Sequence, residues 1–111
     1  MTAQTYQWKA GDTGPTNPTT LVDRDGTPAN LAGATVRFVM RPTPHASPVK
    51  IAAAAAVDDA AGGIVHYERQ AADTDTPGVF HAEYEVTYSS GRVQTYPESG
   101  YITVHISDDL D

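Results

Sequence analysis

Apolar and polar residues alternate between turn-forming residues along much of this chain, and this pattern limits the fold more than any other feature. The clearest run extends from Val79 to Tyr88. Its apolar members are Phe80, Ala82, Tyr84, Val86 and Tyr88, and its polar members are His81, Glu83, Glu85 and Thr87. Because successive side chains of a strand point to opposite faces, the run predicts a β-strand with one face on a core and the other in water.

The same alternation recurs in short segments that end at Gly, Pro, Ser or Asp residues. We expect seven to eight strands: Tyr6 to Lys9, Thr19 to Asp23, Thr35 to Arg41, Val49 to Val57, Ile64 to Arg69, Val79 to Tyr88, Arg92 to Tyr96 and Tyr101 to Ser107. In 111 residues this spacing predicts one all-β domain, an antiparallel sandwich, with residues 1–11 as a loosely attached arm. The expected core includes Val36, Phe38, Tyr84, Val86, Ile102 and Val104.

Five consecutive alanines, Ala52 to Ala56, are the ambiguous segment. Alanine favours helix, but Pro48 precedes the run, Gly62 and Gly63 follow it, and no N-cap residue stands before it. We therefore expect an extended, paired strand, followed by a turn over residues 58–62. A one-turn helix over residues 58–61 is the alternative. Small side chains there either let a neighbouring chain approach closely or mark a tolerant edge strand.

Composition excludes several classes of protein. The chain has no cysteine, which excludes disulfide scaffolds, thiolate metal sites and a Cys nucleophile. Its net charge is -7, and residues 71–111 hold eight acidic groups against the single basic Arg92. That balance argues against nucleic-acid and anionic-membrane partners. The acidic half either provides solubility or forms a face that meets a basic partner. No secretion signal and no membrane-spanning apolar run is present.

A search for catalytic motifs finds none. His45 lies in a Pro-rich loop, and the other histidines, His66, His81 and His105, fall at outward strand positions. The acidic stretch of residues 73–78 has no EF-hand spacing, so we interpret it as a turn with carboxylates that accept backbone hydrogen bonds. We expect no metal, no cofactor and no enzymatic activity.

Two aromatic residues near the N-terminus have two possible roles. Tyr6 and Trp8 lie in a polar segment before the Gly11 to Pro18 break. One interpretation is that they staple the first strand to the sandwich. The other is that they are anchors for a partner protein.

The order of several motifs resembles a known family. The motifs are Asp12-Thr13-Gly14-Pro15, Asp25-Gly26-Thr27-Pro28, Leu31-Ala32-Gly33-Ala34-Thr35-Val36, Gly63-Ile64-Val65-His66-Tyr67, Asp75-Thr76-Pro77-Gly78-Val79-Phe80 and Gly100-Tyr101-Ile102-Thr103-Val104. Over residues 12–107 the chain resembles the immunoglobulin-like domains of tailed-phage virions, in particular the N-terminal domain of the baseplate upper protein. In such a fold Leu31 would plug one end of the sandwich, and Gly33 would turn the chain into the next strand.

The resemblance implies an immunoglobulin-like β-sandwich and a non-enzymatic virion structural protein, docked on other phage structural proteins of the tail tip or baseplate. Association of several copies is left open. Members of this family continue into a stalk or receptor-binding region, whereas this sequence ends at Asp111. The resemblance therefore implies the anchoring role and leaves host adhesion open. A capsid decoration protein is the alternative within the same class. A carbohydrate- or host-surface-binding module is the alternative from another class, disfavoured by outward Glu, His, Thr and Arg residues.

Two surfaces are candidates for partner binding. The first is the outer face of the Val79 to Tyr88 strand, with His81, Glu83 and Glu85, which we expect to be acidic. The second is the Tyr6 to Trp8 segment. Charged residues would mainly set specificity and association rate, whereas aromatic anchors would supply most of the affinity.

Overall fold

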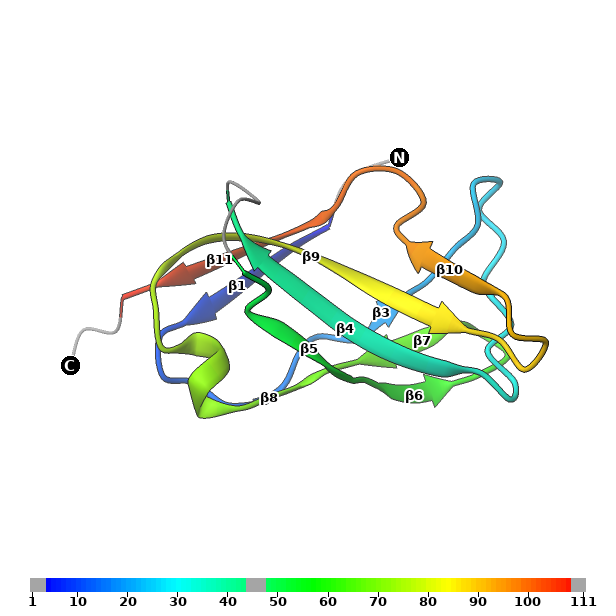
Figure 1. Ribbon diagram of the computed structural model, residues 1–111, viewed down its shortest axis with the longest axis horizontal. Coiled ribbons are helices and arrows are strands. Elements are labelled where there is room, and N and C mark those ends of the chain that lie inside the picture. Colours follow the sequence, from blue (N-terminus) through cyan, green and yellow to red (C-terminus); the bar gives the residue numbers. More distant parts are fainter. Residues whose placement is uncertain (1–3, 44–47, 109–111) are drawn as a thin grey trace.

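The structure is a computed structural model that describes residues 4–43 and 48–108. Within these ranges the chain forms eleven strands and one short 3-10 helix (Figure 1). The strands are β1 Thr5–Lys9, β2 Gly14–Pro15, β3 Thr19–Thr20, β4 Thr35–Pro42, β5 Ile51–Ala54, β6 Ala56–Asp59, β7 Ile64–His66, β8 Glu68–Arg69, β9 Gly78–Thr87, β10 Val93–Tyr96 and β11 Ile102–Ser107, and the helix is η1 Ala71–Thr74.

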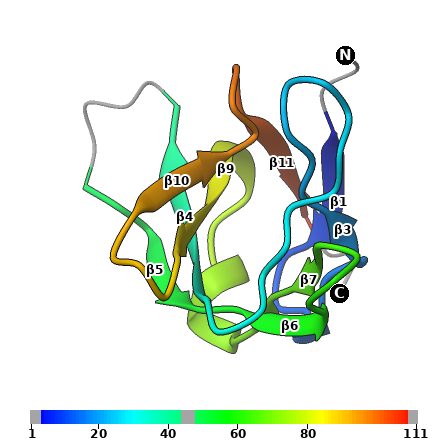
Figure 2. The ribbon, with the colours of Figure 1, turned by 90° about the vertical axis from the view of Figure 1, so that its right-hand side faces the viewer.

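The strands form one large sheet that faces two small ones. The large sheet has the order β1-β11-β9-β4-β5, with β10 paired to β9. The small sheets are β2-β8 and β3-β7-β6. Viewed from the end in Figure 2, β4, β9 and β11 lie across the molecule from β6 and β7, with the core between them. The predicted all-β, antiparallel sandwich is thus confirmed, although β1 pairs with β11 in parallel.

Strand β9 organises the large sheet because it pairs with β4, β10 and β11. Its register places Phe38 opposite Tyr84 and Val36 opposite Val86, so the apolar faces of β4 and β9 point into the same core. All six residues predicted for the core are buried, as are the predicted inward positions Phe80, Ala82 and Met40. Alternation alone therefore identified which face of these strands is buried.

The first strand is firmly attached, which corrects the expectation of a loose arm over residues 5–9. Strand β1 pairs with β11 along its whole length. Tyr6 and Trp8 are 2% and 5% exposed, and both rings pack beside Phe38, with centroids 6.4 and 6.3 Å away. The Tyr6 hydroxyl also bonds to those of Tyr84, at 2.9 Å, and Thr19. These contacts tie the edge of the large sheet to β3 of a small sheet.

The alanine run is extended, as predicted, but it belongs to two sheets. Ala52, Ala53 and Ala54 pair with β4, whereas Ala56 pairs with His66 of β7. The expected single strand is therefore divided at Ala55, where the chain crosses from the large sheet to a small one. Strand pairing continues to Asp59, so the turn comes later than expected and the alternative helix over residues 58–61 is absent.

Two other expected strands are shorter than the alternation suggested. The strand Thr19 to Asp23 keeps only Thr19–Thr20, and Ile64 to Arg69 divides at Tyr67 into β7 and β8. The division arises because β7 pairs with β3 while β8 pairs with β2, and residues 16–18 separate those partners. At the break, Thr16 and Tyr67 exchange hydrogen bonds: the Thr16 N–H donates to the Tyr67 carbonyl, and the Tyr67 N–H to the Thr16 hydroxyl.

The buried aromatic centre predicts a large effect of truncation. Phe38 is fully buried and stacks on Tyr67 at 4.8 Å, so Phe38→Ala should lower the free energy of unfolding by about 3–5 kcal/mol. Val93, on the same sheet but 56% exposed, is the control. Val93→Ala should change the free energy of unfolding by less than about 0.5 kcal/mol. Urea denaturation followed by fluorescence measures both. Equal losses of unfolding free energy in Phe38→Ala and Val93→Ala would contradict the placement of Phe38 at the centre of the core.

Gly63 gives a second, independent test of the packing between turns. Its φ is +69°, and a Cβ there would lie 2.8 Å from the carbonyl oxygens of Leu21 and Ala29. Gly91 has a similar φ of +92° with nothing within 4 Å of that position. Gly91→Ala should therefore cost about 1 kcal/mol of strain alone, whereas Gly63→Ala should cost more than about 2 kcal/mol in the same denaturation experiment. Equal losses would show that these turns are not packed as described.

Candidate partner-binding surface

The outward side chains of β4 and β9 form one exposed surface, which we call the outer face of the large sheet. Register places Arg37 opposite Glu85, Val39 opposite Glu83 and Arg41 opposite His81. The predicted residues His81, Glu83 and Glu85 are therefore brought together on one strand face, as the alternation indicated. None of the described helices or sheets covers this side of the large sheet (Figure 1).

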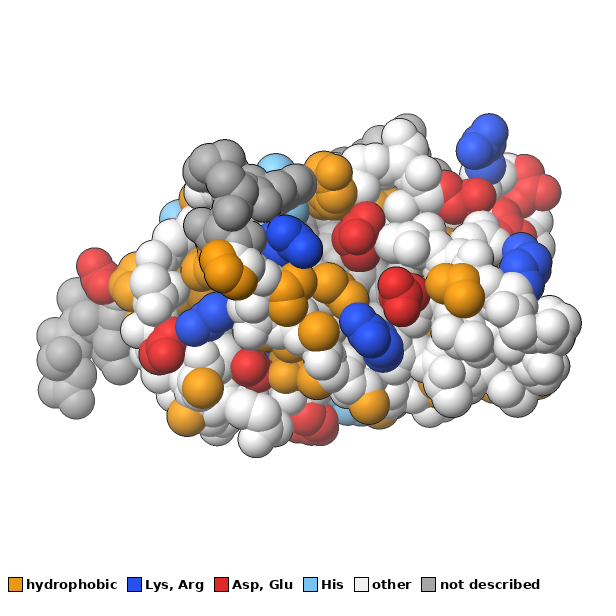
Figure 3. Space-filling view, in the orientation of Figure 1, with side chains coloured by type: hydrophobic (Ala, Val, Ile, Leu, Met, Phe, Trp, Pro, Cys, Tyr) orange, Lys and Arg blue, Asp and Glu red, His pale blue; other side chains and the backbone are white. Residues whose placement is uncertain are grey.

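This face is not acidic, which corrects the expectation drawn from β9 alone. Arg37 Nε lies 3.7 Å from Glu85 Oε1, in a pair whose side chains are 54% and 38% exposed. Arg41 and Glu83 line a shallow pocket of about 290 Å³ together with Val39, His81 and Tyr101. Figure 3 shows basic and acidic side chains interspersed with apolar ones in this view. The basic residues come from β4, so the sequence of β9 alone does not reveal them.

Tyr101 extends the outer face and was missed from the sequence. Its ring stacks on that of His81, with centroids 4.9 Å apart and planes at 10°. Tyr101 is 42% exposed. Its place immediately before Ile102, out of phase with the inward positions of β11, was the available signal for an outward side chain.

The second predicted surface, the Tyr6 to Trp8 segment, is part of the core. Both side chains are buried, and Trp8 is covered by the Arg69 guanidinium, 5.4 Å from the ring centroid. Arg69 is held in turn by the carbonyls of Thr13, Gly14 and Pro15. The structure thus favours the stapling interpretation over the partner-anchor one.

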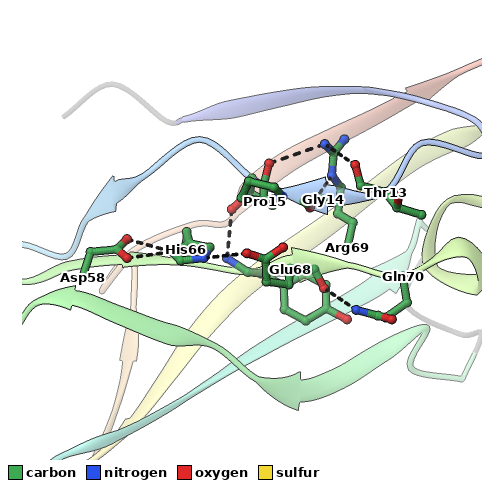
Figure 4. A network of polar contacts seen from close by, with 10 residues as sticks. Thr13, Gly14, Pro15, Asp58, His66, Glu68, Arg69 and Gln70 are labelled. Atoms are coloured by element: carbon green, nitrogen blue, oxygen red, sulfur yellow. Dashed lines mark hydrogen bonds and ion pairs between the residues drawn. The ribbon is translucent and has the colours of Figure 1, made fainter.

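A cluster of polar side chains on the small sheets was not expected (Figure 4). His66 was interpreted as a solvated side chain, but its Nδ1 lies 2.8 Å from the Asp58 carboxylate and its Nε2 3.1 Å from Glu68 Oε1. The hydrogen bond with Asp58 raises the pKa of His66; burial opposes this effect, and Glu68 adds to it. Asp58 comes from β6, eight residues earlier, so only strand pairing reveals the contact.

The cluster is not arranged to hold a metal ion. The carboxylates of Asp58 and Glu68 bind opposite nitrogens of the imidazole, so they do not converge on one ion. Over residues 4–43 and 48–108, no group of three or more His, Cys, Asp or Glu side chains is arranged to hold a metal. His45 lies outside the described residues, as do residues 1–3 of the expected arm and residues 109–111.

The acidic stretch of residues 73–78 joins the end of η1 to the start of β9, and Asp73 accepts a backbone hydrogen bond, as interpreted from the sequence. Asp73 accepts hydrogen bonds from the Gln70 N–H, at 2.7 Å, and from the Tyr67 hydroxyl, at 2.6 Å. The Lys50 ammonium, 2.5 Å from Asp75 Oδ1, lowers the pKa of that carboxyl.

Burial raises the pKa values of Tyr67, Tyr84 and Tyr96, so these hydroxyls stay protonated as structural donors. In the described part of the chain, no helix is long and apolar enough to cross a membrane.

Comparison with known protein families gives a match over nearly the whole chain. The model of the BppU N-terminal domain, the N-terminal domain of the phage baseplate upper protein, matches residues 2–108. The chain belongs to this family. The family is one of structural baseplate proteins and not of enzymes, so the chain is a phage structural protein of the baseplate type. The resemblance seen in the sequence motifs is thereby confirmed. None of the curated proteins compared matches the chain.

The histidine cluster predicts a pH-dependent contribution to stability. The pKa of His66 is higher in the folded than in the unfolded protein, so the protonated imidazole stabilises the fold. This stabilisation is fully present below the unfolded-state pKa of about 6.5, and it is lost as the pH rises through the folded-state pKa. Asp58→Asn should therefore lower the pKa of His66 in an NMR titration, and should destabilise the protein more at pH 5.5 than at pH 8.5.

Glu68→Gln is the matched control, because Glu68 contributes less than Asp58 to the raised pKa. It should lower the pKa of His66 by a smaller amount. A His66 pKa that is unchanged in Asp58→Asn would show that the two side chains do not interact in solution.

Proposed function

We propose that this BppU N-terminal domain is a non-enzymatic virion module that docks on other baseplate proteins through the outer face of the large sheet. The observation that carries the proposal is the distribution of exposed apolar side chains. Five large apolar side chains stand out as exposed among the described residues. Val79 and Tyr101 belong to this face, and Val93 of β10 extends it, because its register partner is Thr87, an outward residue of β9. The other two are Val49 and Val57.

The composition of the face supports a protein partner. Apolar residues alternate with the Arg37–Glu85 pair and with Arg41, His81 and Glu83, and interfaces combine apolar contacts with a polar surround in this way. Because both charge signs occur on neighbouring strands, the face favours a partner with a matching pattern of charges over one that is merely basic. Such a pattern fixes the orientation of docking more than it adds affinity.

No observation favours a capsid-decoration role. The carbohydrate-binding alternative is also not favoured, because Tyr101 is the one exposed aromatic residue described on the outer face, whereas a sugar-binding sheet would be expected to display several.

The proposal is tested by placing one added carboxylate either on the outer face of the large sheet or on a small sheet. Val79→Glu adds a carboxylate to the outer face, whereas Val57→Glu adds one to β6 of a small sheet, at a site of similar exposure, 37% against 45%. Virions are assembled with each variant, and the protein in purified particles is quantified by mass spectrometry. Val79→Glu should reduce incorporation at least about tenfold, since an unpaired buried charge costs several kcal/mol at an interface, and Val57→Glu should match the wild type.

A charge reversal refines this test. Glu85→Arg alone should reduce incorporation, and Arg37→Glu combined with Glu85→Arg should not restore it, although the pair within the sheet is rebuilt. Restoration by the double variant would mean that the pair serves the fold and not docking. Equal incorporation of Val79→Glu and Val57→Glu would contradict docking through this face, and absence of the protein from purified virions would contradict the structural role itself.

A further inference from the structure

A groove of about 550 Å³ lies at the end of the molecule where the described chain begins, and neither the family nor the outer face accounts for it. It separates β3, at the edge of a small sheet, from the β10–β11 connection and the start of β1 in the large sheet. In Figure 2, β3 and β1 lie beside each other at this side of the molecule. Its lining residues are Gln4, Thr19, Thr20, Leu21, Val22, Arg24, Tyr96, Pro97, Ser99, Tyr101 and Ile102. Its size lies in the range of ligand sites.

The groove has an apolar floor and a polar rim. Leu21, Tyr96 and Ile102 are buried side chains that line it from three different segments. Arg24 and Ser99 are exposed at the rim. An apolar side chain of a ligand would therefore find contacts on the floor, while polar groups beside it would meet the rim.

One wall of the groove is an open strand edge. The Leu21 N–H donates to the Gly63 carbonyl at 2.8 Å, on the β7 side of β3. Because hydrogen bonds of an antiparallel strand alternate between its two sides, the N–H and C=O of Thr20 point away from β7. β3 ends the order of its sheet, and no other strand in the described part of the chain pairs with this side. An open edge of this kind is a template for a further strand.

Arg24 supplies a cation that is not used within the fold. Its guanidinium has no ion-pair or hydrogen-bond partner among residues 4–43 and 48–108. The neighbouring carboxylates are already engaged: Asp23 accepts from the Tyr96 hydroxyl at 3.1 Å, and Asp25 from the Thr27 N–H at 3.1 Å. A ligand carboxylate would therefore be the anion that completes this site, in the charge-assisted geometry that Arg favours.

The groove is held open by contacts behind its walls. Tyr88 and Tyr96 share a hydrogen bond of 2.8 Å between their hydroxyls, and Tyr96 also bonds to Asp23, which fixes the segment that carries Arg24. On the other wall, Gly63 packs against the carbonyls of Leu21 and Ala29. A preformed site loses less entropy when a ligand binds.

We propose that this groove binds an extended peptide segment of a partner protein, by strand addition to the open side of β3. An apolar side chain of the segment lies on Leu21 and Ile102, and an acidic side chain reaches Arg24. This mode combines backbone hydrogen bonds for affinity with pockets for alternate side chains. The open strand edge favours a peptide over a saccharide. Tyr101 borders both surfaces, but the open edge of β3 and Arg24 belong to the groove alone, so the inference does not depend on the outer face.

The first experiment uses the whole chain, labelled with ¹⁵N, and the synthetic peptide acetyl-Thr-Val-Thr-Val-Glu-Thr-amide. In an NMR titration, amide shifts should change over residues 19–24 and 99–102. The matched peptide with Gln in place of Glu should bind about tenfold more weakly, because it loses the charge-assisted bond to Arg24.

Three variants assign the contacts. Arg24→Gln should remove the difference between the two peptides. Lys9→Gln removes an equal charge near the other end of β1 and should leave that difference intact. Thr20→Pro removes an N–H that β7 does not use, and should weaken binding of both peptides.

Several results would overturn the proposal. These are no shift at millimolar peptide, equal affinity for the Glu and Gln peptides, or shifts confined to β4 and β9. Maltohexaose is the saccharide probe, and shifts of residues 19–24 and 99–102 with maltohexaose but not with the acidic peptide would make the groove a sugar site. None of these results bears on incorporation of Val79→Glu into virions, so the two proposals fail separately.

Discussion

The fold depends on one buried aromatic centre in which side chains from both layers meet. Phe38 packs against Tyr84 of its own sheet, with ring centroids 5.2 Å apart, and against Tyr67 of the opposite layer, at 4.8 Å. The Tyr6 hydroxyl then joins Tyr84 to Thr19 through buried hydrogen bonds. In a chain without disulfides, this combination of stacked rings and satisfied hydroxyls fixes the distance and register between the sheets.

Side chains from both layers fill the core, so any contact with another molecule must be made at the surface. The outer face of the large sheet keeps apolar side chains in water among paired charges, and the groove beside β3 keeps an open strand edge next to the cation of Arg24. Both places offer apolar and polar contacts to another molecule, and binding is the function that we propose for them. The chain belongs to a family of baseplate structural proteins, and we propose that these surfaces contact other proteins of that assembly.

Period-two alternation predicted most of the fold correctly. It identified β4, β9, β10 and β11, and it gave the buried side of β4, β9 and β11, because these three strands are long and have one face on the core. It failed where the chain changes its pairing partner without any break in the side-chain pattern. At Ala55 the chain leaves the large sheet and joins a small one, and at Tyr67 its partner changes from β3 to β2.

The candidate site was predicted in part for the same reason. His81, Glu83 and Glu85 follow from one strand, but the basic residues beside them come from β4. The Asp58 to His66 contact likewise depends on a pairing that spacing does not encode. For Tyr6 and Trp8 the sequence left two roles open because their segment is polar, and the burial of both rings favours the stapling role.

The most direct test of docking through the outer face is a cryo-electron microscopy map of the tail tip of intact virions. The proposal predicts density for this β-sandwich in the baseplate, with β4 and β9 facing a neighbouring protein and Val79 within contact distance of it. A map in which the sandwich is present but this face is turned to solvent, with the small sheets against the neighbour, would contradict it.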